Sequence, residues 1–174
     1  ILTTSGEELY IWTSEGEFLQ RLEGHIWDVI DVFESRSGTL ISWSYDNTIR
    51  LWSSDGQELA VMNGHTKEII DVIESRNGNI ISLSYDHTIR LWCSDGKELS
   101  VLYGHETCMD SQVLELNDGR IISSAGDNTI WLWNPKNDEI LIAKFDDRIF
   151  LQYLTGTLFK LLNDAKTIIN QDGL

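Results

Sequence analysis

One segment of this chain occurs three times, and the repetition constrains the fold more than any other feature of the sequence. The stretch Ser42-Trp-Ser-Tyr-Asp-Asn-Thr-Ile-Arg-Leu-Trp52 returns as Ser82–Trp92 and again as Ser123–Trp133. A Gly-His pair lies ahead of each copy, and the final Trp follows its His by 27, 27 and 28 positions. A period near forty residues is typical of stacked or circular repeat architectures.

Each copy predicts a small all-β unit. In the first unit the runs rich in β-branched and aromatic residues are Val29 to Glu34, Thr39 to Ser44, Thr48 to Trp52 and Glu58 to Met62. Pairs ending in Gly separate these runs, as in tight hairpins where Gly takes a positive φ. The pairs are Ser37-Gly38, Asn77-Gly78, Asp118-Gly119, Asp55-Gly56 and Asp95-Gly96. We therefore expect each unit to be an antiparallel four-stranded meander.

The alternating direction of the strands sorts the connections to two ends of each unit. The Gly turns fall at one end, whereas the turn after Ser44 and the connection carrying Gly24-His25 fall at the other. We expect His25, Ser42 and Asp46 to lie near this second end, within hydrogen-bonding range of Trp52 on the next strand.

The repeats divide the chain into five segments. These are a partial unit at 1–24, complete units at 25–64, 65–104 and 105–145, and a degenerate partial unit at 146–174. In the first segment Trp12 is retained, but Leu2 stands at the Ser position and Gly6 at the Asp position. In the last segment Asp146 stands where His is expected, and some helix within 158–169 is an alternative there.

The order Gly-His, Ser, Asp and then Trp at the end of Thr-Ile-x-Leu-Trp resembles the WD-repeat family over residues 7 to 145. The family's Trp-Asp dipeptide is absent, but its four network positions are present. The resemblance implies all-β propeller blades of four-stranded antiparallel sheets, three full and two partial or degenerate, within a larger propeller. It also implies that one hydrogen-bond network holds each blade, formed by His25-Ser42-Asp46-Trp52, His65-Ser82-Asp86-Trp92 and His105-Ser123-Asp127-Trp133.

Charge and cysteine content narrow the function classes. The net charge is −15, which argues against nucleic acid or an anionic membrane as the partner. No apolar run approaches the roughly 20 residues of a membrane-spanning helix. Only Cys93 and Cys108 are present, so a disulfide framework is unsupported and a cytoplasmic location is expected.

The combination of Ser, His and Asp invites comparison with a nucleophilic triad, in which His deprotonates Ser and Asp orients His. A catalytic site is needed once, whereas this set occurs three times beside a Trp that hydrolysis does not require. We therefore favour a structural role and expect no catalytic residues. The histidines lack metal-ligand spacing and phosphate-binding Gly motifs are absent, so neither a metal nor a cofactor is expected.

The copies differ most in the segment that follows each His. It reads Ile26-Trp-Asp28, then Thr66-Lys-Glu68, then Glu106-Thr-Cys-Met109. Variation on a constant frame indicates a binding face, although drift on an unconstrained surface would look the same. Aromatic residues are frequent interface anchors, and packing over a blade edge is the alternative. The residues predicted to bind a partner are Trp27, Asp28, Tyr45, Lys67, Glu68, Tyr85 and Met109.

These observations favour a non-enzymatic scaffold for protein–protein interaction, as part of a larger protein. The alternative is a small-molecule sensor or an enzyme that uses the channel of a closed propeller. A third possibility is a segment that only spaces or caps other domains. Exposed blade faces would also allow self-association, because repeat proteins normally cap or bury such faces.

Overall fold

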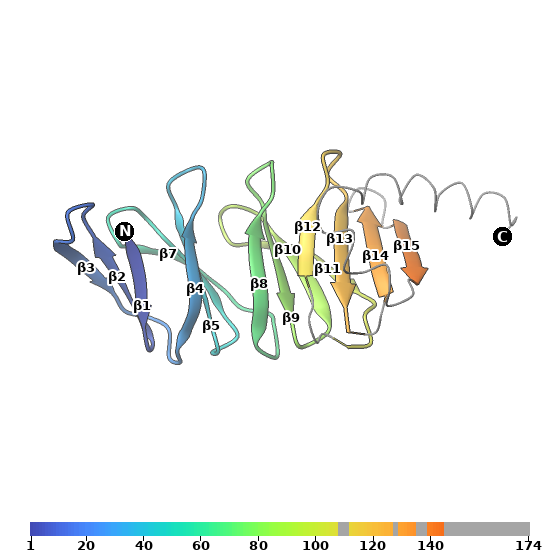
Figure 1. The fold of residues 1–174 in the computed structure, drawn as a ribbon, viewed down its shortest axis with the longest axis horizontal. Helices are drawn as coiled ribbons and strands as arrows, with labels where there is room; N and C mark the ends of the chain where they lie inside the picture. Colours follow the sequence, from blue (N-terminus) through green and yellow to red (C-terminus); the bar gives the residue numbers. More distant parts are fainter. Residues whose placement is uncertain (108–111, 127–128, 135–138, 145–174) are drawn as a thin grey trace, which may run out of the picture.

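The computed structural model describes residues 1–107, 112–126, 129–134 and, for the path of one further strand, 139–144. These residues form fifteen β-strands in four antiparallel sheets that stand side by side (Figure 1). Within the described ranges no helix is long and apolar enough to cross a bilayer. The fifteen strands and four sheets confirm the expected all-β class.

Each sheet is a meander in which consecutive strands pair. Sheet 1 contains β1 (Leu2–Ser5), β2 (Glu8–Trp12) and β3 (Phe18–Leu22). Sheet 2 contains β4 (Val29–Glu34), β5 (Leu40–Ser44), β6 (Ile49–Trp52) and β7 (Glu58–Met62). Sheet 3 contains β8 (Ile69–Glu74), β9 (Ile80–Ser84), β10 (Thr88–Trp92) and β11 (Glu98–Tyr103). Sheet 4 contains β12 (Gln112–Glu115), β13 (Ile121–Ala125), β14 (Thr129–Asn134) and β15 (Glu139–Lys144).

The strands and turns of the first repeat match the expectation from sequence. The four predicted runs coincide with β4 to β7 to within one residue. Gly38 has φ 84° and Gly56 has φ 80°, a left-handed conformation that costs glycine little and other residues much more. The Gly turns therefore are the tight hairpins that the sequence predicts.

The first strands of sheets 2, 3 and 4 face the same side of the molecule. β8 lies beside β5 and β12, and the outer strands β7, β11 and β15 lie on the opposite side of each sheet. The second strands β5, β9 and β13 are buried along their whole length. For β5 and β9 the reason is that a neighbouring sheet covers each of their two faces. This arrangement is an open, partial β-propeller.

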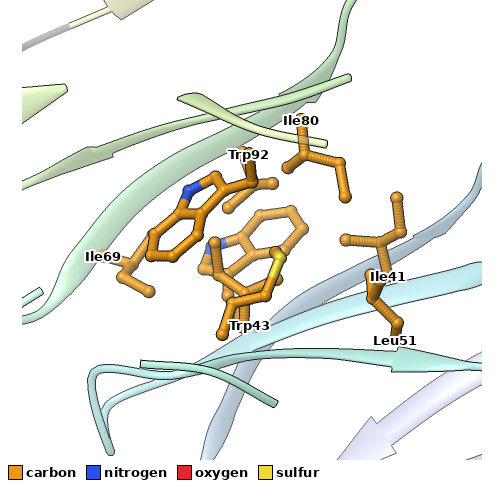
Figure 2. Close-up of a cluster of buried hydrophobic side chains, with 9 residues drawn as sticks. Ile41, Trp43, Leu51, Ile69, Ile80 and Trp92 are labelled. Atoms are coloured by element: carbon orange, nitrogen blue, oxygen red, sulfur yellow. The ribbon is translucent and has the colours of Figure 1, made fainter. Parts of the chain in front are cut away.

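Apolar clusters fill the spaces between the sheets, and the repeated Trp lies in each of them. Between sheets 2 and 3, Trp92 packs with Trp43, Ile41, Ile69 and Ile80 (Figure 2). Trp52 and Trp133 occupy the corresponding clusters on either side of this one. Each repeated Trp therefore packs against the sheet that precedes its own.

Sheet 1 corrects one expectation. Thr3, and not Leu2, takes the position of the repeated Ser, and Trp12 Nε1 donates to Thr3 Oγ1 at 2.8 Å. Leu2 instead pairs with Ile11. The reason is that the turn after β1 is one residue shorter than the turn after β5, so counting back from Trp12 by the repeat spacing overshoots by one residue.

Charged bonds tie the Gly turns of neighbouring sheets together. The Arg36 backbone N–H donates to Glu74 at 3.0 Å. The Arg36 guanidinium also donates to Glu74 and to the carbonyl oxygens of Ser75 and Arg76. In the next sheet the Arg76 backbone N–H donates to Glu115 at 2.7 Å. The turns are thus linked in order along the array.

The degenerate unit predicted at 146–174, with its possible helix, lies outside the described residues, as do Asp127 and Met109.

Candidate functional site

The structure brings the repeated His, Ser, Asp and Trp together in sheets 2 and 3. His25 Nδ1 lies 2.9 Å from Asp46 Oδ2, and His25 Nε2 lies 2.9 Å from Ser42 Oγ, which also accepts from Trp52 Nε1 at 2.9 Å. In sheet 3 the same three distances, for His65, Ser82, Asp86 and Trp92, are 2.9, 2.7 and 2.8 Å. In sheet 4 the His105–Ser123 and Trp133–Ser123 distances are both 2.8 Å.

The donors and acceptors of this network form one directed chain. The Trp52 indole N–H donates to the Ser42 oxygen, which leaves the Ser42 hydroxyl proton for His25 Nε2. His25 must then carry its proton on Nδ1 and donate it to Asp46. We assign this tautomer from the bonding pattern. The side-chain polar atoms of Trp52, Ser42, His25 and Asp46 therefore all have a partner within this network, which avoids the cost of an unpaired buried group.

The threonine of the Thr-Ile-x-Leu-Trp run was missed in the sequence analysis as a network member. Thr48 Oγ1 donates to Asp46 Oδ1 at 2.6 Å, and Thr88 makes the same bond to Asp86. Its occurrence at the same position in every copy was the available signal.

Burial and hydrogen bonding act in opposite directions on the network carboxylates. Burial alone raises the pKa of Asp46, but the hydrogen bonds from His25, Thr48 and the Ile26 backbone outweigh it. The pKa of Asp46 is therefore held well below its usual range, and the pKa of Asp86 is lowered in the same way. Both carboxylates are ionised at neutral pH.

The network cannot work as a hydrolytic triad in this form. The Ser42, Ser82 and Ser123 side chains are completely buried, with 0% exposure, so a substrate cannot reach their hydroxyl oxygens. Each of these oxygens is also occupied by an indole N–H. A nucleophile needs access to the substrate as well as a base.

The network also positions the variable segment that follows each His. Asp46 Oδ2 accepts from the Ile26 backbone N–H at 3.1 Å, and Ser44 Oγ donates to the Trp27 carbonyl at 2.9 Å. In sheet 3, Asp86 and Ser84 make the same bonds to Thr66 and Lys67. The variable side chains therefore project from a backbone that the constant residues hold.

A hollow of about 560 Å³ opens between sheets 2 and 3 at this end. Trp27, Tyr45 and Tyr85 are 64%, 46% and 41% exposed, which is high for large aromatic side chains. The hollow is lined by Ile26, Trp27, Tyr45, Asp46, Asn47, Lys67, Glu68 and Tyr85.

Five of the seven residues predicted to bind a partner line this hollow, namely Trp27, Tyr45, Lys67, Glu68 and Tyr85. Asp28 does not line it, and its carboxylate is the nearest side-chain group to Gly6 of sheet 1. Ile26 and Asn47 were missed. Ile26 belongs to the variable segment, whereas only the structure shows the left-handed φ of 66° that places Asn47 beside it.

The repeat unit of this chain is similar to that of known proteins. A family model described as WD domain, G-beta repeat matches residues 16–53, 56–93 and 96–134, more than half of the chain. Each match takes in the last strand of one sheet and the first three strands of the next. No curated protein matches. The crystal structure of the WD40 beta propeller domain of Doa1 is similar, with 25% identity and a TM-score of 0.64. The similarity covers 83% of this chain and 50% of that one.

Proposed function

The chain belongs to the WD domain, G-beta repeat family, and from this premise we propose that it is a non-enzymatic scaffold for protein–protein interaction. Domains of this family generally serve as such scaffolds. We further propose that its docking face is the end of the sheets that carries the His networks, and that the networks themselves are structural.

The hollow between sheets 2 and 3 carries this proposal. It gathers exposed aromatic side chains that the constant frame holds in place, and its lining includes Ile26, Trp27, Lys67 and Glu68 of the segment that varies between the copies. The opposite end offers much less, because turns such as Ser54-Asp55-Gly56 are small and nearly uniform between copies. Specificity requires side chains that differ from those on competing surfaces.

The extent and location of the protein are part of the proposal. The chain spans about half the length of the Doa1 propeller chain that it matches. We propose that the blades are divided at 24/25, 64/65, 104/105 and 145/146 and that they form part of a larger propeller. A free thiol at Cys93 supports a cytoplasmic location.

A pull-down that compares two alanine variants tests the docking face. Tyr45→Ala removes an exposed ring from the hollow, and Gln57→Ala alters a Gly turn at the opposite end. We expect Tyr45→Ala to reduce recovery of the partner and Gln57→Ala to leave it unchanged. Equal retention by both variants would remove the argument for this face.

A further inference from the structure

We propose that the hollow between sheets 2 and 3 binds an arginine side chain from a basic segment of the partner protein. The proposal rests on the proposed scaffold function and adds the chemistry of the residue recognised. Three features carry it: the aromatic walls, the charges, and the restriction of the full set to one gap between sheets.

The walls of the hollow suit a flat cation. Trp27 and Tyr45 come from sheet 2 and its preceding segment, and Tyr85 comes from sheet 3, so the rings approach the hollow from both sides. Aromatic faces attract cations electrostatically, and a guanidinium can also stack flat on a ring. The exposed rings also place apolar area in contact with water, and a bound side chain would cover part of that area.

The charges favour a cation over an anion. The Glu68 carboxylate has no ion pair or side-chain hydrogen bond with any described residue. The Asp46 carboxylate adds a second negative charge behind the wall of the hollow; its side chain is 2% exposed and held by His25, so it attracts a cation without touching it. The whole chain carries −15, which attracts basic partners over a longer range. Arginine fits this set better than lysine, because its planar fork can stack and pair with a carboxylate at once.

Among the described residues that line the hollow, Lys67 is the one cation, and its charge repels a bound cation. It therefore offers an internal test of sign. Removing the Lys67 charge should strengthen binding of a cation, whereas removing the Glu68 charge should weaken it. For an anionic ligand both effects would be reversed.

The next gap along the array lacks this combination. The position of Trp27 in sheet 2 is taken by Lys67 in sheet 3. The position of Tyr45 in sheet 2 and Tyr85 in sheet 3 is taken by Gly126 in sheet 4. The gap between sheets 3 and 4 therefore keeps Tyr85 and loses the other two rings. The three rings therefore come together in the gap between sheets 2 and 3 and not in the gap between sheets 3 and 4.

Titration of the 174-residue chain with N-acetyl-arginine methylamide, followed by two-dimensional NMR, tests the proposal. The neutral isostere N-acetyl-citrulline methylamide is the matched control probe. We expect the arginine probe to shift the Trp27 indole N–H resonance in a saturable way and the citrulline probe to bind about two- to fivefold more weakly. No saturable shift with the arginine probe, or equal binding of both probes, would overturn the proposal.

Variants locate the site and check the sign of its charge. We expect Glu68→Gln and Tyr85→Ala each to weaken arginine binding about two- to fivefold, and Lys67→Gln to strengthen it about twofold. Tyr103→Ala is the control, because Tyr103 is 67% exposed and ends β11 at the same end of the molecule without lining the hollow. Equal effects of Tyr85→Ala and Tyr103→Ala would place the binding elsewhere.

The pull-down separates failure of this inference from failure of the proposed function. If Tyr45→Ala loses the partner while Glu68→Gln and Lys67→Gln retain it fully, the scaffold function stands and the arginine assignment is wrong. If N-acetyl-glutamate methylamide binds and Lys67→Gln abolishes that binding, the ligand is acidic and the assignment is again wrong. If Tyr45→Ala retains the partner, the docking face itself fails.

Discussion

At the scale of single residues, the network aspartate connects more groups than the His, Ser or Trp of the same network. Asp46 accepts hydrogen bonds from His25, from the Thr48 side chain and backbone, and from the Ile26 backbone. Asp46 therefore links the turn after β5 to the segment that carries Trp27. The residues that stabilise the blade and those that shape the hollow are coupled through one carboxylate.

Removing this carboxylate should destabilise the fold. We expect Asp46→Ala and Asp86→Ala each to lower the free energy of unfolding by about 1 to 3 kcal/mol, because the His and backbone donors lose their acceptor. Denaturant unfolding of the two variants measures the loss. The two values should be similar, since each network belongs to its own sheet, and unchanged midpoints in both variants would contradict the assigned role.

The lowered pKa values of Asp46 and Asp86 predict a specific dependence of stability on pH. A carboxyl whose folded pKa lies below its unfolded value of about 3.9 stabilises the fold fully above that value, and loses this contribution as pH falls below it. The free energy of unfolding, measured with denaturant at a series of pH values from 7 downward, should therefore decrease less steeply below pH ~4 in the double variant Asp46→Asn/Asp86→Asn than in the unmodified chain.

Asp71 provides a control of opposite sign for the pH series. Burial, with a smaller contribution from the nearby Asp31 carboxylate, raises the pKa of Asp71. Its ionisation therefore costs stability as pH rises through the region of its unfolded pKa. The substitution Asp71→Asn should therefore raise the free energy of unfolding more at pH 7 than at low pH, where the Asp71 carboxyl is protonated. The same slope in both variants would show that neither carboxylate is responsible.

At the scale of elements, the turns and connections set how closely neighbouring strands can approach. Gly64, before the second network His, lies against the Arg90 guanidinium and the Trp92 ring, so that a Cβ at this position would overlap Arg90. Gly24 lies against Arg50 and Trp52 in the same way. Close approach, and not a positive φ, therefore favours Gly before the network His, since a larger residue would have to displace the Arg guanidinium that packs there.

The links between Gly turns should contribute measurably to the stability of the array. Arg36→Ala removes the bonds from the Arg36 guanidinium to Glu74 and to the turn of sheet 3. We expect a loss of about 1 kcal/mol in the free energy of unfolding, measured with denaturant. Arg120→Ala is the matched control and should change stability by less than about 0.5 kcal/mol, because among the described residues the Arg120 side chain pairs within its own turn, with Asp118. Equal losses would mean that the links between sheets add nothing.

At the scale of the whole molecule, sheet 1 presents an aromatic face that no described sheet covers. Leu9 and Leu22 point to sheet 2 and pack with Trp52, so Tyr10 and Trp12, which alternate with them, point the other way. Phe18 packs on Trp12 with ring centroids 5.6 Å apart and is 55% exposed. Sheets 2 and 3 carry Arg–Glu ion pairs at the positions of Tyr10 and Phe18. This face is suited to burial against another sheet.

The isolated 174-residue chain is therefore expected to self-associate. Light scattering should report a dimer or larger species, because contact between copies would bury the face of Tyr10, Trp12 and Phe18. Tyr10→Arg/Phe18→Glu installs the ion pair of sheets 2 and 3 and should shift the chain toward the monomer. A monomer that unfolds cooperatively without these substitutions would refute the argument from exposed faces.

The repeat pattern by itself predicted the strands, the turns and the His, Ser, Asp and Trp of the network, but not its Thr. Local preferences suffice for this purpose, because alternating apolar runs separated by Gly turns permit one meander, and three copies report the same unit independently. Five of the residues that line the hollow were also predicted: Trp27, Lys67 and Glu68 because the copies differ there, and Tyr45 and Tyr85 because they are aromatic and precede the network Asp. Thr3 was missed, since the spacing in sheet 1 changes by one residue and a count along the sequence cannot detect a shortened turn.

Only the tertiary structure decided which residues face one another across two sheets. Trp27, Lys67 and Tyr85 belong to different copies, and their common hollow depends on how far apart sheets 2 and 3 stand. That separation is set by the packing of Trp92 and Trp43 with the side chains between the sheets, a sum of long-range contacts that no local pattern contains. The burial of Ser42 likewise follows from the covering of both faces of β5, which turns a triad-like sequence into a closed network inside the protein.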